Sequence, residues 1–260
     1  MKKNACITVL SKDHQGQAKK LSEILSEYGL AFAGHFWEDN LQQMAWSMAQ
    51  KELTKEDVAL WIILGSKAMF ESESVRYGLA MLTLGVQATR GHGFPIALVT
   101  TEKDWKPASL PTPLQAASVF SLNNPSLGAK ITVMVNKPAP KVTASYRLDV
   151  YAVPAIGQWL EIGPPAGEVW KGALFAVSDG EIRAHGVGPK GTLPQKTVLE
   201  YAMQGLKINQ GEKEFTGWAV KNSIDSEHSY YVGILGNPAA IMFGQFPETD
   251  EAELFKVNLK

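Results

Sequence analysis

One segment, VALWIILG at residues 58–65, constrains the fold more than any other part of the chain. It is apolar from end to end, which is typical of a strand covered on both faces. Such strands occur in parallel sheets, because the crossover helices of these sheets pack on each side. The segment therefore predicts the central strand of an α/β domain.

Strand and helix patterns alternate around this segment. Further strands are expected at 5–10, 30–37, 94–100 and 117–122, and helices at 16–30, 41–53 and 74–89. Alternation with short connections implies a parallel sheet with right-handed crossovers. We predict a doubly wound, flavodoxin-like order, with any ligand at the carboxyl ends of the strands.

The pattern changes after this series. Residues 123–136 are expected to contain one more strand, and Lys137-Pro138-Ala139-Pro140-Lys141 follows. Alternating prolines resist both helix and central strand, so 138–144 is predicted to be a semi-rigid linker. The linker separates an α/β domain at 1–137 from a second domain at 145–260.

The second domain is predicted to be β-rich and antiparallel. Its turn signals recur between runs rich in Val, Tyr, Trp and Phe, and the sequence at 178–180, Ser-Asp-Gly, predicts a hairpin. One segment, 193–208, looks helical, with Pro194 suited to a first turn. Trp159, Trp170 and Trp218 could form a stacking platform for sugar, but packing in the core is the favoured interpretation.

The composition limits the partners and the compartment. The 260 residues carry 25 Lys and Arg against 26 Asp and Glu, a net charge of −1. We therefore expect neither a nucleic-acid groove nor a membrane-binding face, since both usually show clustered positive charge. The sequence also has no apolar run long enough for a membrane helix. The single cysteine, Cys6, excludes an internal disulfide and favours a reducing, cytoplasmic location.

The loop after the first strand, SKDHQGQ, is where a doubly wound fold would hold a phosphate. It contains neither the Walker pattern nor the dinucleotide fingerprint. Ser11, Asp13 and Gln15 are candidate ligand-binding residues, although the favoured interpretation is that Ser11 or Asp13 caps the following helix. The five histidines are isolated from one another, so no metal site is expected.

The first half of the chain resembles a TIR domain over residues 4–122. The matching residues are Ser11, Asp13, Asp57, Ser66, Leu79 and the Pro95-Ile96 pair. The resemblance implies two activities, which are protein association in signalling and cleavage of the nicotinamide–ribose bond of NAD. The second would take NAD or ADP-ribose as ligand and requires a glutamate at the start of the third helix.

That glutamate is missing. In this sequence its position falls on Gly78 within SVRYGLAM, at 74–81. A related resemblance, to nucleoside deoxyribosyltransferases, places Arg76 where their nucleophilic glutamate stands. Glu71 and Glu73 lie just upstream and could replace the carboxylate, with Ser11, Asp13 and Arg76 lining the same site. Ser66 is a further candidate ligand-binding residue. The favoured interpretation is that the two acids are solvated or start the helix, where negative charge favours the dipole, and that Arg76 is a surface residue.

Three functions remain open. The favoured one is a non-catalytic binding or signalling protein whose TIR-like domain and β-rich interaction domain act through a protein partner or self-association. The alternative is a hydrolase or transferase of the N-glycosidic bond of NAD or a nucleoside, with Glu71 or Glu73 as the displaced carboxylate. An FMN-binding module ranks last, because SKDHQGQ lacks the repeated hydroxyl residues of such phosphate loops.

Overall fold

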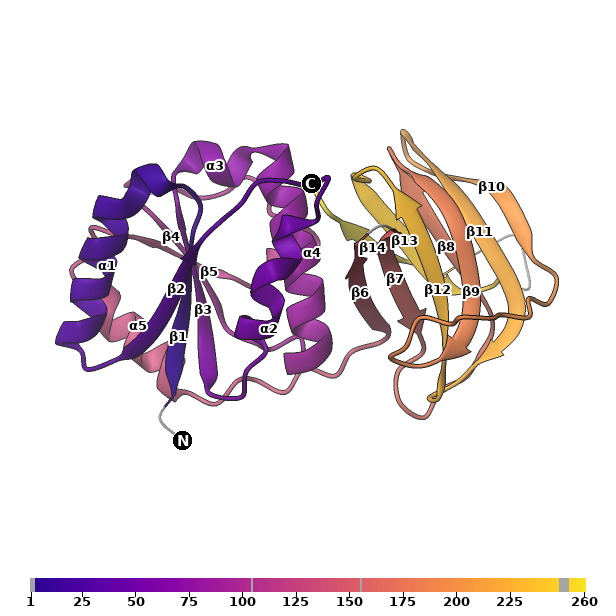
Figure 1. Ribbon diagram of the computed structural model, residues 1–260, viewed down its shortest axis with the longest axis horizontal. Coiled ribbons are helices and arrows are strands. Elements are labelled where there is room, and N and C mark those ends of the chain that lie inside the picture. The colour runs from indigo at the N-terminus through magenta and orange to yellow at the C-terminus, as the bar shows by residue number, and fades with distance from the viewer. Residues whose placement is uncertain (1–2, 104, 155, 248–252) are drawn as a thin grey trace. The chain divides into compact units, whose positions relative to one another are not determined.

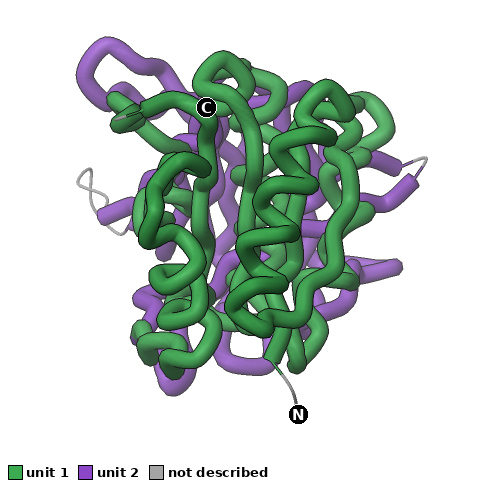
Figure 2. Tube along the Cα trace, turned by 90° about the vertical axis from the view of Figure 1, so that its left-hand side faces the viewer, with its two compact units in different colours: residues 1–142 green, residues 143–260 purple. Residues whose placement is uncertain are grey.

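The computed structural model describes residues 3–103, 105–154, 156–247 and 253–260. The chain forms two compact units, Met1–Val142 and Thr143–Lys260, which Figure 2 colours separately. Unit 1 is an α/β domain and unit 2 an antiparallel β domain, as the sequence predicts.

Unit 1 is built on a five-stranded parallel sheet. Its strands are β1 (Asn4–Val9), β2 (Ala31–Phe36), β3 (Val58–Gly65), β4 (Ile96–Thr100) and β5 (Ser118–Ser121). They lie in the order β2-β1-β3-β4-β5, which is the flavodoxin-like order (Figure 1). The predicted doubly wound sheet is confirmed, with β3 at its centre and Leu60, Ile62 and Leu64 fully buried.

Helical segments cover both faces of this sheet (Figure 1). They are η1 (Lys12–His14), α1 (Gln15–Glu27), η2 (Ala45–Ala49), α2 (Gln50–Leu53), α3 (Lys67–Glu71), α4 (Glu73–Arg90), η3 (Thr112–Leu114) and α5 (Leu127–Asn136). On one face α1 and α5 contact each other, and Leu21, Leu25 and Ile131 complete the core. On the other face α4 packs with η2 and α2. A search of the described residues finds no helix that could cross a membrane.

Two predictions for unit 1 were wrong, the first of them only in part. The helix expected at 41–53 begins only at Ala45, because Met44 adopts a left-handed backbone (φ 51°) and Asn40 caps a turn instead. The strand expected within 123–136 is the helix α5. Its β-branched residues favour a strand by propensity, but Leu127, Ile131 and Val135 recur every four residues and bury one helical face.

Unit 2 contains two antiparallel sheets. One has the order β6-β7-β12-β9 and the other β10-β11-β8-β13-β14. The strands are β6 (Arg147–Val153), β7 (Gly157–Gly163), β8 (Trp170–Ser178), β9 (Glu181–Pro189), β10 (Met203–Gln210), β11 (Lys213–Ile224), β12 (His228–Leu235), β13 (Ala240–Gln245) and β14 (Phe255–Asn258). The two sheets meet where Trp218 of β11 contacts His185 of β9 edge-on, with their ring centroids 4.8 Å apart. Unit 2 is therefore a β-sandwich.

The helix expected at 193–208 is wrong, since the described residues of unit 2 hold only strands, turns and loops. β10 starts at Met203, and Leu206 and Ile208 pack beside Phe215 of the neighbouring strand. Gly205 takes a positive φ of 72°, which a helix does not allow. The positive φ of Gly205 and the packing of Leu206 and Ile208 against β11 therefore outweigh the helical spacing of the sequence.

The hairpin predicted at 178–180 is also wrong, although the tight turn is present. Asp179 has a positive φ of 55°, as expected for Asp-Gly. However, β8 already pairs with β11 on one side and β13 on the other. Because no edge of β8 is free, β9 continues into the opposite sheet. The turn therefore joins two sheets rather than two paired strands.

Candidate functional site

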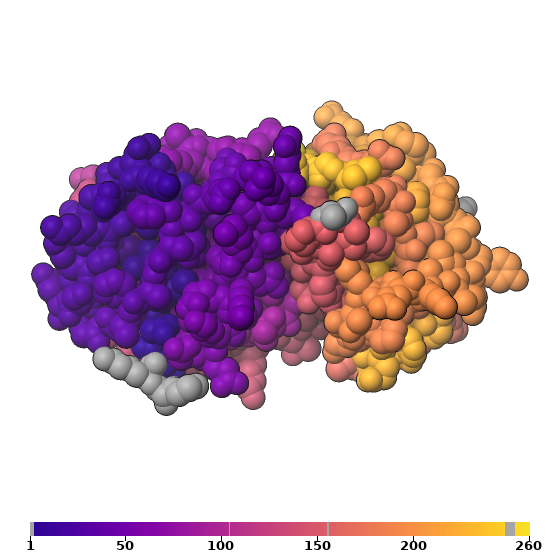
Figure 3. Space-filling model, viewed as in Figure 1, coloured from indigo at the N-terminus to yellow at the C-terminus, as the bar shows by residue number. Residues whose placement is uncertain are grey.

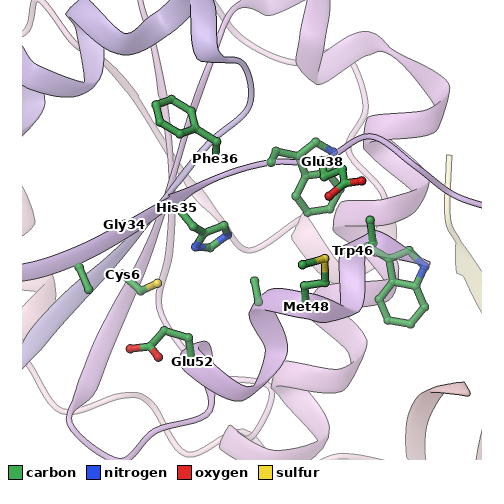
Figure 4. Close-up of a pocket in the computed structure, with 12 residues that line it drawn as sticks. Cys6, Gly34, His35, Phe36, Glu38, Trp46, Met48 and Glu52 are labelled. Carbon is green, nitrogen blue, oxygen red and sulfur yellow. The ribbon is translucent and has the colours of Figure 1, made fainter. Parts of the chain in front are cut away.

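A cavity of unit 1 lies beside the edge strand β2 (Figure 4) and has a volume of about 510 Å³. We call it the aromatic cavity. Its walls come from β1, β2, the segment after β2, η2 and α2. The residues that line it are Cys6, Ala33, Gly34, His35, Phe36, Trp37, Glu38, Ala45, Trp46, Met48, Ala49 and Glu52.

The cavity exists because the connection from β2 to β3 contains little helix. The chain becomes helical only at Ala45, and α2 has just four residues. Ala33 and Gly34 of β2 therefore remain exposed on the sheet. A long helix at this position would cover them, as helices normally do in doubly wound folds.

His35 lies at the centre of the cavity (Figure 4), and a hydrogen bond with Thr8 fixes its ring. Its Nε2 is 3.0 Å from Thr8 Oγ1, and this hydroxyl accepts a hydrogen bond from Trp61 Nε1 at 2.8 Å. The indole can only donate, so the Thr8 hydroxyl proton is available to His35 Nε2. This arrangement favours the neutral tautomer with its proton on Nδ1. Burial also lowers the pKa of His35, which favours the neutral ring.

The lowered pKa of His35 predicts a pH-dependent stability. The unfolded chain binds the proton more readily, with a pKa of about 6.5, so the stabilisation is present above that pH and is lost as the pH falls below it. His35→Gln should therefore reduce the difference in melting temperature between pH 7.5 and pH 5.5. Burial also lowers the pKa of His92 and His185, so the stability of the variant should still depend on pH. The test is whether this dependence is smaller in the variant than in the wild type. An unchanged difference would contradict the assignment.

The other ionisable groups of the cavity are a thiol and two carboxylates. Burial, with the nearby charge of Glu52, raises the pKa of Cys6 to about 11, so its thiol is protonated at neutral pH and a poor nucleophile. Glu52 is 2.5 Å from Lys55 Nζ, and Glu38 is exposed at the rim. None of the lining residues is Lys or Arg. The cavity thus combines aromatic walls with acidic side chains.

The residues predicted from the first loop lie outside the cavity. Ser11 accepts a hydrogen bond from the backbone N–H of Asp13 at 3.1 Å and donates one to its carboxylate at 3.1 Å. This is the capping role, at the start of η1. Gln15 is exposed at the first position of α1. Ser66 is half-buried immediately before α3.

An acid that the sequence analysis missed lies near Ser66. This acid is Glu102. Burial raises its pKa, but hydrogen bonds from Thr100, from the backbone N–H of Lys67 and from Thr101 lower the pKa by more. A fixed carboxylate thus lies at the first residue of α3, near the carboxyl end of β4. A bound phosphate there would face this charge. The available signal was an acid two residues beyond a buried strand.

The remaining predicted residues lie outside the aromatic cavity but close to one another, since burial lowers the pKa of Arg76 and the nearby charges of Glu71 and Glu73 oppose this shift. Arg76 donates from Nη1 to the carbonyl oxygen of Ser109 at 2.9 Å, which ties α4 to a loop. Glu71 is exposed and lies 3.9 Å from Lys67 Nζ. Glu73 is exposed at the first position of α4. None of Arg76, Glu71 and Glu73 lines the aromatic cavity.

The position of the missing glutamate is closed by packing. Gly78 is buried in α4, and a Cβ atom added to it would lie 2.7 Å from Cζ2 of Trp37. Any side chain at residue 78 must displace this indole, which also forms a wall of the cavity. Gly78 is therefore required for close contact between α4 and Trp37.

The tryptophans of unit 2 do not share one stacking surface. Trp159 lies against Gly233 of β12, where an added Cβ would be 3.0 Å from the indole. Trp218 contacts His185 between the sheets, and Trp170 is 5% exposed. The favoured interpretation, packing in the core, fits Trp170 and the contact of Trp218 between the sheets, although Trp159 and Trp218 are only half-buried.

The chain was compared with models of known families and with curated proteins. No family model matches the chain, and no curated protein matches it. What unit 1 shows is a flavodoxin-like α/β fold.

Proposed function

We propose that this protein is a non-catalytic binding protein. The observation that carries the proposal is the contact of Trp37 with Gly78 in α4. At the position where the resemblance requires a carboxylate, an indole fills the space. The neutral His35 and the protonated thiol of Cys6 add recognition groups rather than a nucleophile.

The ligand we propose for the aromatic cavity is a small organic cation with an apolar body. Aromatic faces attract cations through their ring quadrupole, and nearby carboxylates attract them through their negative charge. The cavity presents the half-buried indole of Trp37 beside Glu38 and Glu52, whereas Trp46 is only 1% exposed and the Phe36 ring points away from His35 (Figure 4). NAD and ADP-ribose, the ligands of the competing enzyme hypothesis, carry phosphates that these carboxylates would repel.

We further propose that the protein acts as a TIR-like signalling module in a reducing cytoplasm, through a protein partner or self-association. Exposed apolar side chains beside the cavity support association, namely Phe32, Phe36 and Met48. The β-sandwich would serve as a second interaction domain. A single cysteine, buried in β1 and without a disulfide partner, supports the compartment.

Isothermal titration calorimetry with tetraethylammonium, choline and ADP-ribose tests the ligand class. The two cations should bind and ADP-ribose should not. Glu38→Gln combined with Glu52→Gln should weaken cation binding about 10-fold, which corresponds to about 1.4 kcal/mol. Glu23→Gln is the matched control, since this acid lies on α1 outside the cavity. Binding of ADP-ribose, or cation binding that ignores both cavity acids, would contradict the proposal.

A further inference from the structure

The edge strand β2 has an unpaired side. β2 is the outermost strand of its sheet and pairs with β1 alone among the described residues. In Figure 3 this side of unit 1, formed by the indigo and purple atoms of the first part of the chain, faces the viewer. Exposed strand edges template pairing with another chain, and proteins usually protect them with charges, prolines or bulges.

β2 has none of these protections. The ten residues from Tyr28 to Trp37 include no Asp, Glu, Lys, Arg or Pro. Phe32 and Phe36 are 36% and 42% exposed. The pairing of β2 with β1 runs without a shift over its six residues, so no bulge turns the edge away. The edge is thus both apolar and regular.

The backbone shows which residues face outward. Trp37 donates its N–H to the carbonyl oxygen of Val9 at 2.8 Å. Alternate residues of a parallel strand bond to the same neighbour, so residues 33 and 35 also face β1. Residues 32, 34 and 36 consequently turn their N–H and C=O groups toward the free edge.

These outward residues are self-complementary about Gly34. In an antiparallel pair of two β2 strands related by a twofold axis at Gly34, Phe32 of one strand lies opposite Phe36 of the other. Both phenylalanines repeat this pairing across the axis, and small Ala33 faces His35. The alternation rule gives about six backbone hydrogen bonds between the strands. Aromatic pairs opposite each other stabilise such contacts, and no like charges oppose each other.

We propose that two copies of this chain associate through antiparallel pairing of β2 with β2, which joins their two sheets into one continuous sheet. A twofold axis of this kind is the commonest symmetry of protein dimers and needs a patch that matches itself. The sequence Phe-Ala-Gly-His-Phe at 32–36 is such a patch. The dimer identifies a second copy of the chain as the partner of the binding protein proposed above. Only this identification rests on the proposed function.

The mass of the full-length protein, measured by light scattering after size exclusion, tests the dimer. The wild type should have twice the chain mass of 28.4 kDa. Phe32→Lys with Phe36→Lys places two lysines opposite two lysines and should weaken the dimer by on the order of 100-fold. Val133→Lys is the matched control, because this side chain is 62% exposed but lies on α5 rather than on β2. It should leave the dimer intact.

Hydrogen exchange of the wild type gives a second readout that does not depend on folding of the variant. In the dimer the amides of residues 32, 34 and 36 should be protected as well as those of 33 and 35. A monomeric wild type at high concentration, or a dimer whose even-numbered β2 amides exchange rapidly, overturns the proposal. A monomer that still binds tetraethylammonium would overturn the dimer and leave the proposed function intact. A β2 dimer that binds no cation would do the reverse.

Discussion

Replacing Gly78 with glutamate is expected to destabilise unit 1 by about 3 kcal/mol or more. The new Cβ would lie 2.7 Å from Trp37 Cζ2, and overpacking of this kind alone costs about 1–3 kcal/mol. The added carboxylate would also be buried on α4, which raises the cost further. Urea unfolding followed by tryptophan fluorescence measures the change in the free energy of unfolding.

Gly16→Ala is the matched control for this substitution. Gly16 is also helical, but a Cβ added there meets nothing within 4 Å. Alanine should therefore stabilise the chain by about 0.5–1 kcal/mol. If Gly78→Glu were as stable as the wild type, the packing explanation for the missing carboxylate would fail.

Glu161→Leu is expected to destabilise unit 2 by about 3–5 kcal/mol. Glu161 is 4% exposed in β7 and accepts hydrogen bonds from Ser229 Oγ at 2.6 Å and from the backbone N–H of Gly191 at 3.0 Å. The hydroxyl of Tyr151 donates to its other oxygen. Leucine would leave the buried hydroxyl of Ser229 and the half-buried hydroxyl of Tyr151 without this acceptor, at a cost of about 1–3 kcal/mol each, whereas the N–H of the exposed Gly191 can bind water.

Two substitutions separate this hydrogen-bond network from a general effect of charge. Glu161→Gln keeps the shape and one carbonyl acceptor, so it should destabilise less than leucine. Glu181→Gln removes an exposed acid from β9 and should change the free energy of unfolding by less than about 0.5 kcal/mol. Urea unfolding of the three variants ranks them. An effect of Glu161→Leu no larger than that of Glu181→Gln would contradict the proposed role.

The fold could be predicted where burial dictates one pattern. β3 is apolar throughout because helices cover both of its faces, and this pattern has few other solutions. α5 was missed because its β-branched run is typical of a strand, while its four-residue spacing matters only when a sheet lies beneath it. β10 was missed for the opposite reason, since its helical spacing is overridden by pairing with β11.

The candidate site was less predictable than the fold. His35 has no recognisable motif, and its importance arises from Thr8 and Trp61 on two neighbouring strands. The aromatic cavity depends on how late the crossover after β2 becomes helical. The absent carboxylate at Gly78 was visible in the sequence, but the indole that explains it comes from a distant loop.

Incubation of the wild-type protein with NAD, with nicotinamide release followed by chromatography, tests binding against catalysis most directly. We predict no release above the protein-free background, and the same result for Glu71→Gln combined with Glu73→Gln. These two acids are exposed, and Glu71 lies beside Lys67 rather than in a cavity. Release of nicotinamide by the wild type that disappears in the double variant would contradict the proposed function and establish the displaced carboxylate.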